Sequence, residues 1–465
     1  MVKGGREAPA EHHGEEGPGP LAEREAGNEH VETTPASTAE PDADARCACS
    51  HNMASGVLHG AFFQMATAFG DPHAVIPLFL AGFTESKAVI GFVVSLVGAV
   101  GAVPQLAMSR QIRRAPGTAR TFMLVGIWTR CGVWGLIAAC ALLMPVGSSW
   151  ILILFAFLIS VYSLGGGIAV LPFKHVISGT IPPERRSSFF GWRLVTGGVL
   201  AVLAGVIVKC VLGSEELAWP RNYGVLFGLS SVALAIAYAA MSRLRFPPHP
   251  AGPQRIELRP LREELNYVRR EYPILRRLIL VRLLSGGLPL VLPFLTLYAT
   301  REMGISLAWV GIYVAAQKAG AILSNLAWMP LGNRVGTRAV ILSGLAVTLS
   351  SFVTILLSVS PITVGVAFVL AGSGMSATAV GFNGYVLELG TPEIRPLLFA
   401  LEGTLLVPLH FMPLLGGLLA DAFEYRVVVL VGGALLLAGL GCAATLCEPR
   451  RGGAACGPAR PRVEI

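Results

Sequence analysis

Long apolar runs recur along most of the chain, and they constrain its fold more than any other feature. Each run is close to the roughly 20 residues that an α-helix needs to cross a bilayer. Hydrophobic residues make up 53% of the 465 residues and charged residues only 14%, whereas soluble domains carry about 25% charged residues. Because a helix satisfies its own backbone in lipid, the sequence predicts an all-α membrane protein.

The apolar runs predict twelve transmembrane helices. They cover 55–80, 88–108, 121–144, 150–172, 189–212, 223–243, 277–300, 306–327, 338–358, 361–386, 396–420 and 426–447. A longer segment rich in proline and arginine separates the sixth run from the seventh. We therefore expect two six-helix bundles joined by this segment.

The pattern divides the chain into five parts. Residues 1–52 hold eleven acidic and four basic residues without an apolar period, which predicts a disordered acidic tail. The N-terminal bundle is expected at 53–243 and the C-terminal bundle at 277–447. Between them, residues 244–276 should form a cytoplasmic loop with a short amphipathic helix on the membrane surface. Residues 448–465 form a predicted disordered basic tail.

Lysines and arginines gather in alternate connections between the runs. They follow the second, fourth, eighth and tenth runs and fill the central loop, whereas the opposite connections hold few. The positive-inside bias therefore predicts that both termini are cytoplasmic and that the chain lies in the plasma (inner) membrane. The net charge of +8 is then a feature of topology, and we expect no nucleic-acid partner.

Short motifs recur in the two halves of the chain. Gly-Thr-Ile-Pro-Pro-Glu-Arg-Arg at 179–186 resembles Gly-Thr-Pro-Glu-Ile-Arg at 390–395, and Gly-Thr-Ala-Arg at 117–120 resembles Gly-Thr-Arg at 336–338. The spacing of about 210–220 residues is close to half of the apolar core, which predicts two homologous bundles related by pseudo-symmetry.

The segment 329–338 reads Met-Pro-Leu-Gly-Asn-Arg-Val-Gly-Thr-Arg. It resembles the G-x-L-a-D-r-x-G-r-R motif that the major facilitator superfamily carries after its second and eighth helices. Arg334 and Arg338 match the motif, whereas Asn333 stands where the family usually has Asp. The first copy, around Ser109–Arg114, is degenerate. The resemblance to the superfamily covers about residues 53–447. Some uncharacterised prokaryotic members are similar through the Asp-Pro stretch at 71–72 and the Tyr-Ser-Leu-Gly-Gly-Gly segment at 162–167.

The resemblance implies twelve helices in two pseudo-symmetric six-helix bundles, and a secondary transporter that moves a small-molecule substrate by alternating access. It also implies that the first, fourth, seventh and tenth helices line the substrate cavity. We expect proton coupling, in a monomer embedded in the lipid bilayer. Two alternatives stay open: an efflux pump for amphipathic compounds, and a non-transporting membrane sensor or scaffold with the same fold.

The first run contains Asp71, Pro72 and His73 at membrane depth. Charge there is costly and usually functional, and a proline breaks the helix. We therefore predict a discontinuity in the first helix, with Asp71 as the proton carrier and His73 as a coupling or substrate contact. The alternative is a structural Asp71, which pairs with a neighbouring helix or caps the break at Pro72.

Other polar residues also lie inside apolar runs. Arg130 in the third run and Lys318 in the eighth indicate either an anionic cargo or structural ion pairs. We expect Arg282 to pair with a glutamate near the cytoplasmic end of the bundle. The remaining candidates for substrate or ion contact are Gln64, Gln317 and Asn383. The candidates for gating are Arg282, Glu388, Glu402, Arg334 and Arg338.

Motifs of enzymes and metal sites are scarce. The chain has no Gly-rich phosphate loop, no H-E-x-x-H and no G-x-S-x-G motif, so we expect neither an enzyme nor a cofactor. Cys47, Cys49 and His51 form a C-x-C-x-H group. That pattern alone is a weak metal signature, and we predict no metal site.

Overall fold

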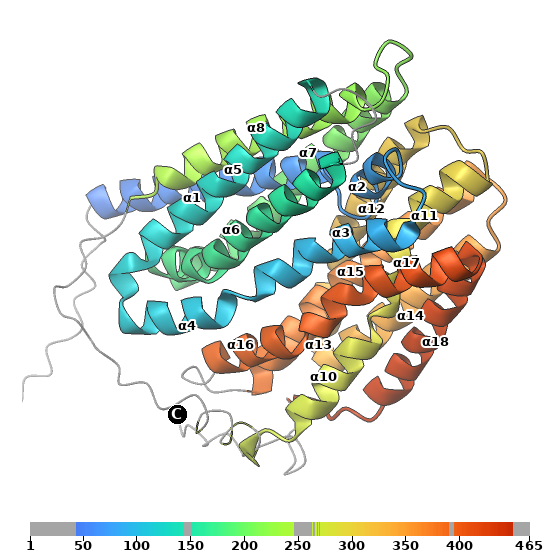
Figure 1. The fold of residues 1–465 in the computed structure, drawn as a ribbon. Helices are drawn as coiled ribbons and strands as arrows, with labels where there is room; N and C mark the ends of the chain where they lie inside the picture. The colour runs from blue at the N-terminus through green and yellow to red at the C-terminus, as the bar shows by residue number, and fades with distance from the viewer. Residues whose placement is uncertain are drawn as a thin grey trace, which may run out of the picture. The chain divides into compact units, whose positions relative to one another are not determined.

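The computed structural model describes residues 43–143, 150–245, 270–389 and 395–449, and three single residues between 262 and 269. All regular elements in these residues are helices (Figure 1). Residues 44–465 belong to one compact unit. The predicted tails at 1–42 and 450–465, and most of the predicted amphipathic helix of the central loop, lie outside the described residues.

The described residues of the first half contain eight α-helices. Their bounds are α1 (Ala43–Phe69), α2 (Val75–Leu80), α3 (Lys87–Ala102), α4 (Gln105–Arg114), α5 (Ala119–Leu143), α6 (Trp150–Thr180), α7 (Pro183–Leu212) and α8 (Arg221–Ser242), with a 3-10 turn η1 (Pro116–Thr118) before α5. Proline and glycine set several boundaries. Pro182 and Pro183 separate α6 from α7, because proline fits the first turn of a helix and not its interior.

The second half repeats this pattern of long and broken helices. The bounds are α10 (Ile274–Leu284), α11 (Gly287–Leu297), η2 (Tyr298–Glu302), α12 (Ala308–Leu323), α13 (Asn325–Arg334), α14 (Thr337–Leu356), α15 (Pro361–Leu389), α16 (Arg395–Leu405), η3 (Val407–Phe411), α17 (Met412–Ala422) and α18 (Tyr425–Ala443). Gly336 adopts φ 124° just before α14, a conformation that residues with a Cβ rarely adopt.

Ten helical segments among the described residues are long and apolar enough to cross a membrane. The predicted count of twelve is therefore not confirmed. The missing spans are the first and the eighth. Helix α1 begins with polar residues and stops at Phe69, and α12 has only 16 residues before Ser324 separates it from α13. Both interruptions fall at polar positions inside the bundle, where a regular apolar helix is not maintained.

Helix α1 begins at Ala43, inside the segment that we predicted as a disordered tail. Its early residues bind the end of the first half. The side-chain amide of Asn52 donates to the Arg245 carbonyl over 2.8 Å, and the His51 ring bonds to the Arg243 carbonyl over 3.0 Å. These contacts, which no local pattern indicates, correct the predicted boundary at residue 52. The described residues contain no cluster of three potential metal ligands.

The most extensive contacts between the two halves are those of α3 with α17 and of α7 with α12 (Figure 1). Glycines permit the close approach. A Cβ at Gly417 would overlap the Lys87 carbonyl, and a Cβ at Gly91 would overlap the Pro413 carbonyl. Small residues at such crossings are typical of membrane helices, because they let backbones pack directly.

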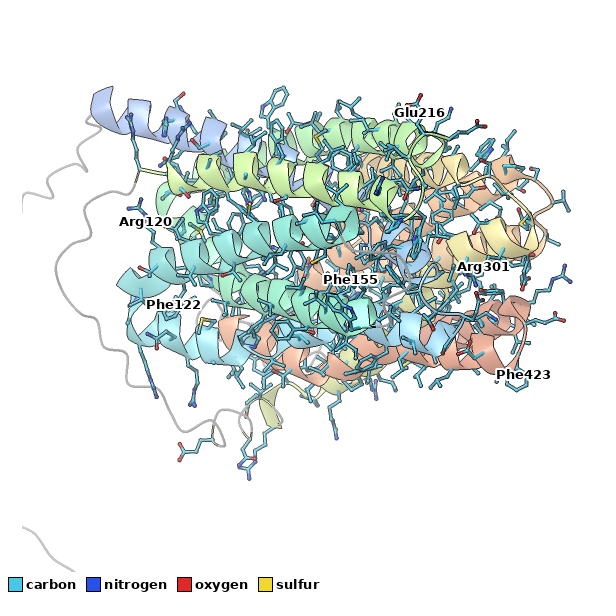
Figure 2. The ribbon with its side chains drawn as sticks, turned by 45° about the horizontal axis from the view of Figure 1, so that its top comes forward. Arg120, Phe122, Phe155, Glu216, Arg301 and Phe423 are labelled. Atoms are coloured by element: carbon cyan, nitrogen blue, oxygen red, sulfur yellow. The ribbon has the colours of Figure 1, made fainter. Side chains whose placement is uncertain are left out.

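Polar contacts tie the two halves together at one end. The Asp421 carboxylate, at the end of α17, accepts hydrogen bonds from the Ser86 hydroxyl and from the backbone N–H groups of Lys87 and Ala88, over 2.8–2.9 Å. Arg301 forms a 2.9 Å salt bridge with Glu85. Figure 2 shows Arg301 with Glu216 and Phe423 at this end, and Arg120 and Phe122 at the opposite end. We call the end of the molecule that contains Glu216, Arg301 and Phe423 the tied end.

Candidate functional site

The predicted discontinuity in the first span lies between α1 and α2. The Asp71 carbonyl accepts from the backbone N–H groups of Val75 and Ile76, both over 3.0 Å, and its Oδ1 accepts from the His73 N–H over 2.9 Å. Asp71 therefore orders the turn between α1 and α2 through both its side chain and its carbonyl, while Ala74 is the residue that directly precedes α2. Gly70 is required beside it, because a Cβ there would come within 2.6 Å of the Trp134 ring.

The second carboxylate oxygen of Asp71 forms an ion pair across the two halves. Lys318 Nζ, on α12, lies 2.8 Å from Asp71 Oδ2. Asp71 is fully buried, whereas the Lys318 side chain keeps 21% exposure. Breaking a buried pair is costly because it leaves a charge without compensation. The pair therefore holds the α1–α2 break against α12.

The Asp71–Lys318 pair faces a cavity of about 630 Å³, which we call the main cavity. Its volume is in the range of small-molecule sites. The lining comes mostly from α1, α3, α5 and α6, and the second half contributes Lys318, Met375 and His410. The predicted site residues Asp71, His73, Arg130 and Lys318 all line this cavity.

Arg130 lies on the α5 wall of the main cavity. Its Nη2 donates to the Tyr162 hydroxyl over 2.5 Å, and its guanidinium lies over the rings of Tyr162 and Phe63, 4.3 and 5.2 Å from their centroids. Its buried Nε has no hydrogen-bond partner. Gly166 on α6 lies beside this group, and a Cβ there would meet the guanidinium carbon at an ordinary contact distance of 3.5 Å.

Arg193 also lines the main cavity, and the sequence analysis did not single it out. Its Nη1 lies 2.7 Å from His59 Nδ1 and donates to the Gly56 carbonyl over 2.9 Å. Helix α7 begins at Pro183 rather than near 189, so Arg193 lies well inside it. An earlier helix start, indicated by the Pro-Pro pair, was the signal that could have revealed this position.

Two side cavities adjoin the main one. A cavity of about 260 Å³ is lined by Gln64, Gln317 and Lys318, and one of about 200 Å³ by His73 and Arg282. Gln317 is buried, and its Nε2 lies 3.5 Å from Met375 Sδ. Asn383 is exposed and lines none of the cavities described here.

The predicted gating residues lie in more than one place. Arg282 lies over the Phe382 ring at 4.7 Å. Its charge also acts on Glu402, although no salt bridge of the described residues joins the two, so the expected pairing with a glutamate stays a prediction. Glu402 is buried on α16. Glu388 accepts a hydrogen bond from Thr337 over 3.0 Å.

The arginines of the 329–338 motif lie at the end of the second half. Arg338 donates from Nη2 to the Ala444 carbonyl over 2.6 Å, and its backbone N–H donates to Glu448 over 3.1 Å. Arg334 is exposed at the end of α13. The described contacts of Arg338 therefore stay within one half of the chain.

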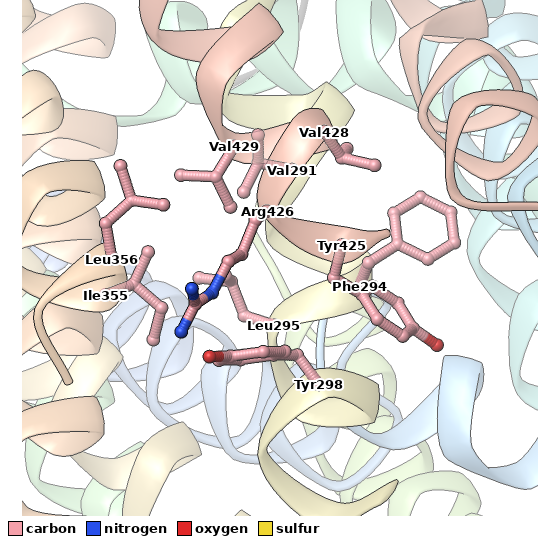
Figure 3. Close-up of a pocket in the computed structure, with 10 residues that line it drawn as sticks. All are labelled: Val291, Phe294, Leu295, Tyr298, Ile355, Leu356, Tyr425, Arg426, Val428 and Val429. Carbon is pink, nitrogen blue, oxygen red and sulfur yellow. The ribbon is translucent and has the colours of Figure 1, made fainter. Parts of the chain in front are cut away.

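A separate hollow lies between α11, α14 and α18, near the tied end. Figure 3 shows Tyr298 and Arg426 among apolar side chains that include Val291 and Ile355. Its volume is about 10 Å³, close to the minimum that holds one water molecule. It is too small for a solute, so the main cavity is the candidate site.

Known proteins share this architecture. The family model described as Major Facilitator Superfamily matches residues 283–455. The crystal structure of a D-xylose-proton symporter has a TM-score of 0.67 at 13% identity, covering 86% of this chain and 98% of that chain. A mutant of the nucleoside transporter NupG has a TM-score of 0.61 at 15% identity, covering 85% and 100%. No curated protein matches the chain in sequence.

A third structure adds a further type of cargo. A bacterial homologue of the iron transporter ferroportin, in its inward-facing state, has a TM-score of 0.61 at 15% identity and covers 86% of this chain and 98% of that chain. Identities this low show a shared fold and no more. Over residues 283–455 the chain is similar to the Major Facilitator Superfamily, and its described helices include ten that are long and apolar enough to cross a membrane.

Proposed function

We propose that the chain is a secondary transporter that moves a small solute by alternating access and couples this movement to protons. One observation carries the proposal. The buried Asp71–Lys318 ion pair joins the two halves at the wall of the main cavity. An ionisable group buried inside a membrane bundle is functional by default, because it is expensive to keep there.

The pair provides a simple coupling device. When Asp71 is charged, it holds Lys318 and keeps α12 against the α1–α2 break. When Asp71 takes up a proton, the attraction is lost and the two halves separate more easily. A proton or solute shifts this equilibrium only by its differential affinity for the two states. His73 is the other titratable group that contacts Asp71, so a test of pH dependence must include it.

The expected orientation remains part of the proposal. The basic connections place both termini in the cytoplasm of a plasma or inner membrane. The tied end then faces outward. Monomeric function is expected from the fold, since each half supplies residues to the main cavity within one chain.

Export of amphipathic compounds is a second candidate direction of transport. The cavity wall includes Phe63, Trp134, Phe173 and Tyr238, and aromatic walls suit solutes with a large apolar body. Uptake and export are distinguished by the sign of the current in vesicles of known orientation.

The proposal is tested in proteoliposomes with a solute library on a solid-supported membrane. A solute that gives a transient current in the wild type is then measured with and without a pH gradient. We expect Asp71→Asn to abolish the response to the pH gradient while solute exchange without a gradient persists, whereas His73→Gln keeps both. Full pH-driven accumulation in Asp71→Asn would falsify the coupling role.

A further inference from the structure

We infer that the main cavity binds an organic oxyanion, a solute with a carboxylate or similar group attached to an apolar body, and that Arg130 holds the anionic group. This inference rests on the proposed transport function for its physiological meaning. The binding itself can be measured without transport. Three observations support it: the net charge of the cavity wall, the hydrogen-bond geometry of Arg130, and the apolar surface of the rest of the wall.

The charge of the wall is unbalanced toward the positive side. Asp71 is the only acidic residue among the described cavity-lining residues, and Lys318 already pairs with it. Arg130 and Arg193 also line the cavity, and no salt bridge of the described chain includes either of them. Guanidinium groups enclosed by a membrane bundle favour a counter-charge. An anionic solute would supply it.

The guanidinium of Arg130 is held between two aromatic rings and has one buried donor without a partner. Tyr162 takes a hydrogen bond from Nη2 and provides a ring face, while Phe63 provides a second ring contact. Nε has no partner. A planar guanidinium binds carboxylate and phosphate groups through two parallel hydrogen bonds, which a lysine cannot do. Arg130 therefore provides an oriented donor pair rather than a diffuse charge.

The rest of the cavity surface fits the apolar body of such a solute. Trp134, Ile159, Val170 and Phe173 line the wall around Arg130. Apolar walls with a few oriented polar groups are the usual form of small-molecule sites. A volume of about 630 Å³ accommodates an aromatic or branched aliphatic body, so a small inorganic anion would leave much of this wall without contacts.

The test compares probes of matched shape and different charge. Benzoate, phenylphosphonate and neutral benzamide are titrated against the purified full-length protein at constant pH, with binding followed by thermal stabilisation. We expect at least one oxyanion to bind about 10-fold more tightly than benzamide. A difference of that size is typical when a hydrogen bond to a charged group replaces one to a neutral group. The two oxyanions distinguish a carboxylate site from a phosphonate or phosphate site.

Variants assign the preference to Arg130. In Arg130→Gln, we expect the oxyanion and benzamide to bind within about 2-fold of one another, because the fork and its charge are both removed. Arg221→Gln, on the exposed start of α8 outside the cavity, is the matched control and should keep the wild-type preference. Arg130→Lys keeps the charge without the fork, and its preference should lie between those of the wild type and Arg130→Gln.

Three results would overturn the inference. They are equal or tighter binding of benzamide in the wild type, no binding of either oxyanion, and an unchanged preference in Arg130→Gln. If Arg130→Gln does not fold, an unchanged preference in Arg130→Lys decides against it. These results are separate from proton coupling. Asp71→Asn can lose its response to a pH gradient while the oxyanion preference persists. Conversely, the oxyanion preference can be absent while the pH gradient still drives transport.

Discussion

Asp71 serves two purposes with its two carboxylate oxygens. Oδ1 accepts the His73 N–H and orders the break between α1 and α2, while Oδ2 contacts Lys318. The structural and functional interpretations of this residue are therefore compatible. Protonation on Oδ2 would release Lys318 and leave the hydrogen bond from the His73 N–H to Oδ1 intact. The helix break thus stays ordered while the link between the two halves changes.

Removal of Lys318 tests the importance of the ion pair for stability. We expect Lys318→Met to destabilise the protein by roughly 3 kcal/mol, at the lower end of the range for buried pairs because Lys318 keeps partial exposure. Asp71→Asn combined with Lys318→Met should recover most of this loss, since no buried charge is then left alone. The measurement is thermal and chemical unfolding in detergent.

The exposed Lys209 at the end of α7 provides the control for this series. Lys209→Met should unfold like the wild type. Equal stability of wild type and Lys318→Met would show that the pair contributes nothing to the folded state. A double variant as unstable as the single one would show that packing, rather than unpaired charge, explains the loss.

At the scale of the elements, uninterrupted spans could be predicted closely from the sequence. The run 223–243 corresponds to α8 (Arg221–Ser242) and the run 338–358 to α14 (Thr337–Leu356). Hydropathy alone specifies such helices. The bounds of the broken spans were harder to predict. The glycine, proline and polar residues in these spans suit the cavity that they line, so hydropathy does not mark where each helix begins and ends. The Asp71 and Lys318 partners are 247 residues apart, and no local pattern can join them.

The α3–α17 crossing is expected to control the tied end. Gly417→Ala places a Cβ against the Lys87 carbonyl and should separate α17 from α3. The hydrogen bonds from Lys87 and Ala88 to Asp421 would then weaken. The exchange rates of these two amides should rise about 10-fold, because lowering the free energy of local opening by about 1.4 kcal/mol raises the open population by a factor of 10.

Hydrogen-exchange mass spectrometry of the peptide that begins α3 measures this effect. Gly433→Ala is the matched control, because a Cβ there meets only ordinary contacts at 3.8–4.0 Å. It should leave exchange at Lys87 and Ala88 unchanged. Equal exchange in the Gly417 and Gly433 variants would mean that the crossing does not determine closure of the tied end.

At the scale of the whole molecule, the two halves share one cavity and are joined by polar contacts on one side of it. Opening the tied end requires separation of Asp421 from α3, of Arg301 from Glu85, and of Asp71 from Lys318. The first two contacts involve exposed groups, which contribute little. The buried pair is the contact that a proton can switch, and it therefore dominates the equilibrium in our account.

The most direct test measures the separation of the two halves as a function of pH. Spin labels are introduced at Glu216 and Glu424, exposed positions at the tied end in different halves, through an orthogonal amino acid that leaves the native cysteines unlabelled. Double electron–electron resonance at about pH 8 and about pH 3 then reports the distance between them. The lower pH is strongly acidic because the Lys318 ion pair favours the charged form of Asp71.

In the wild type and in His73→Gln, we expect a short distance at about pH 8 and a growing long-distance population at about pH 3. Asp71→Asn should show the long-distance population at both values, because its side chain cannot hold Lys318 as an ion pair. A short distance in Asp71→Asn that still lengthens at low pH would contradict the account, since another group would then control the separation of the halves.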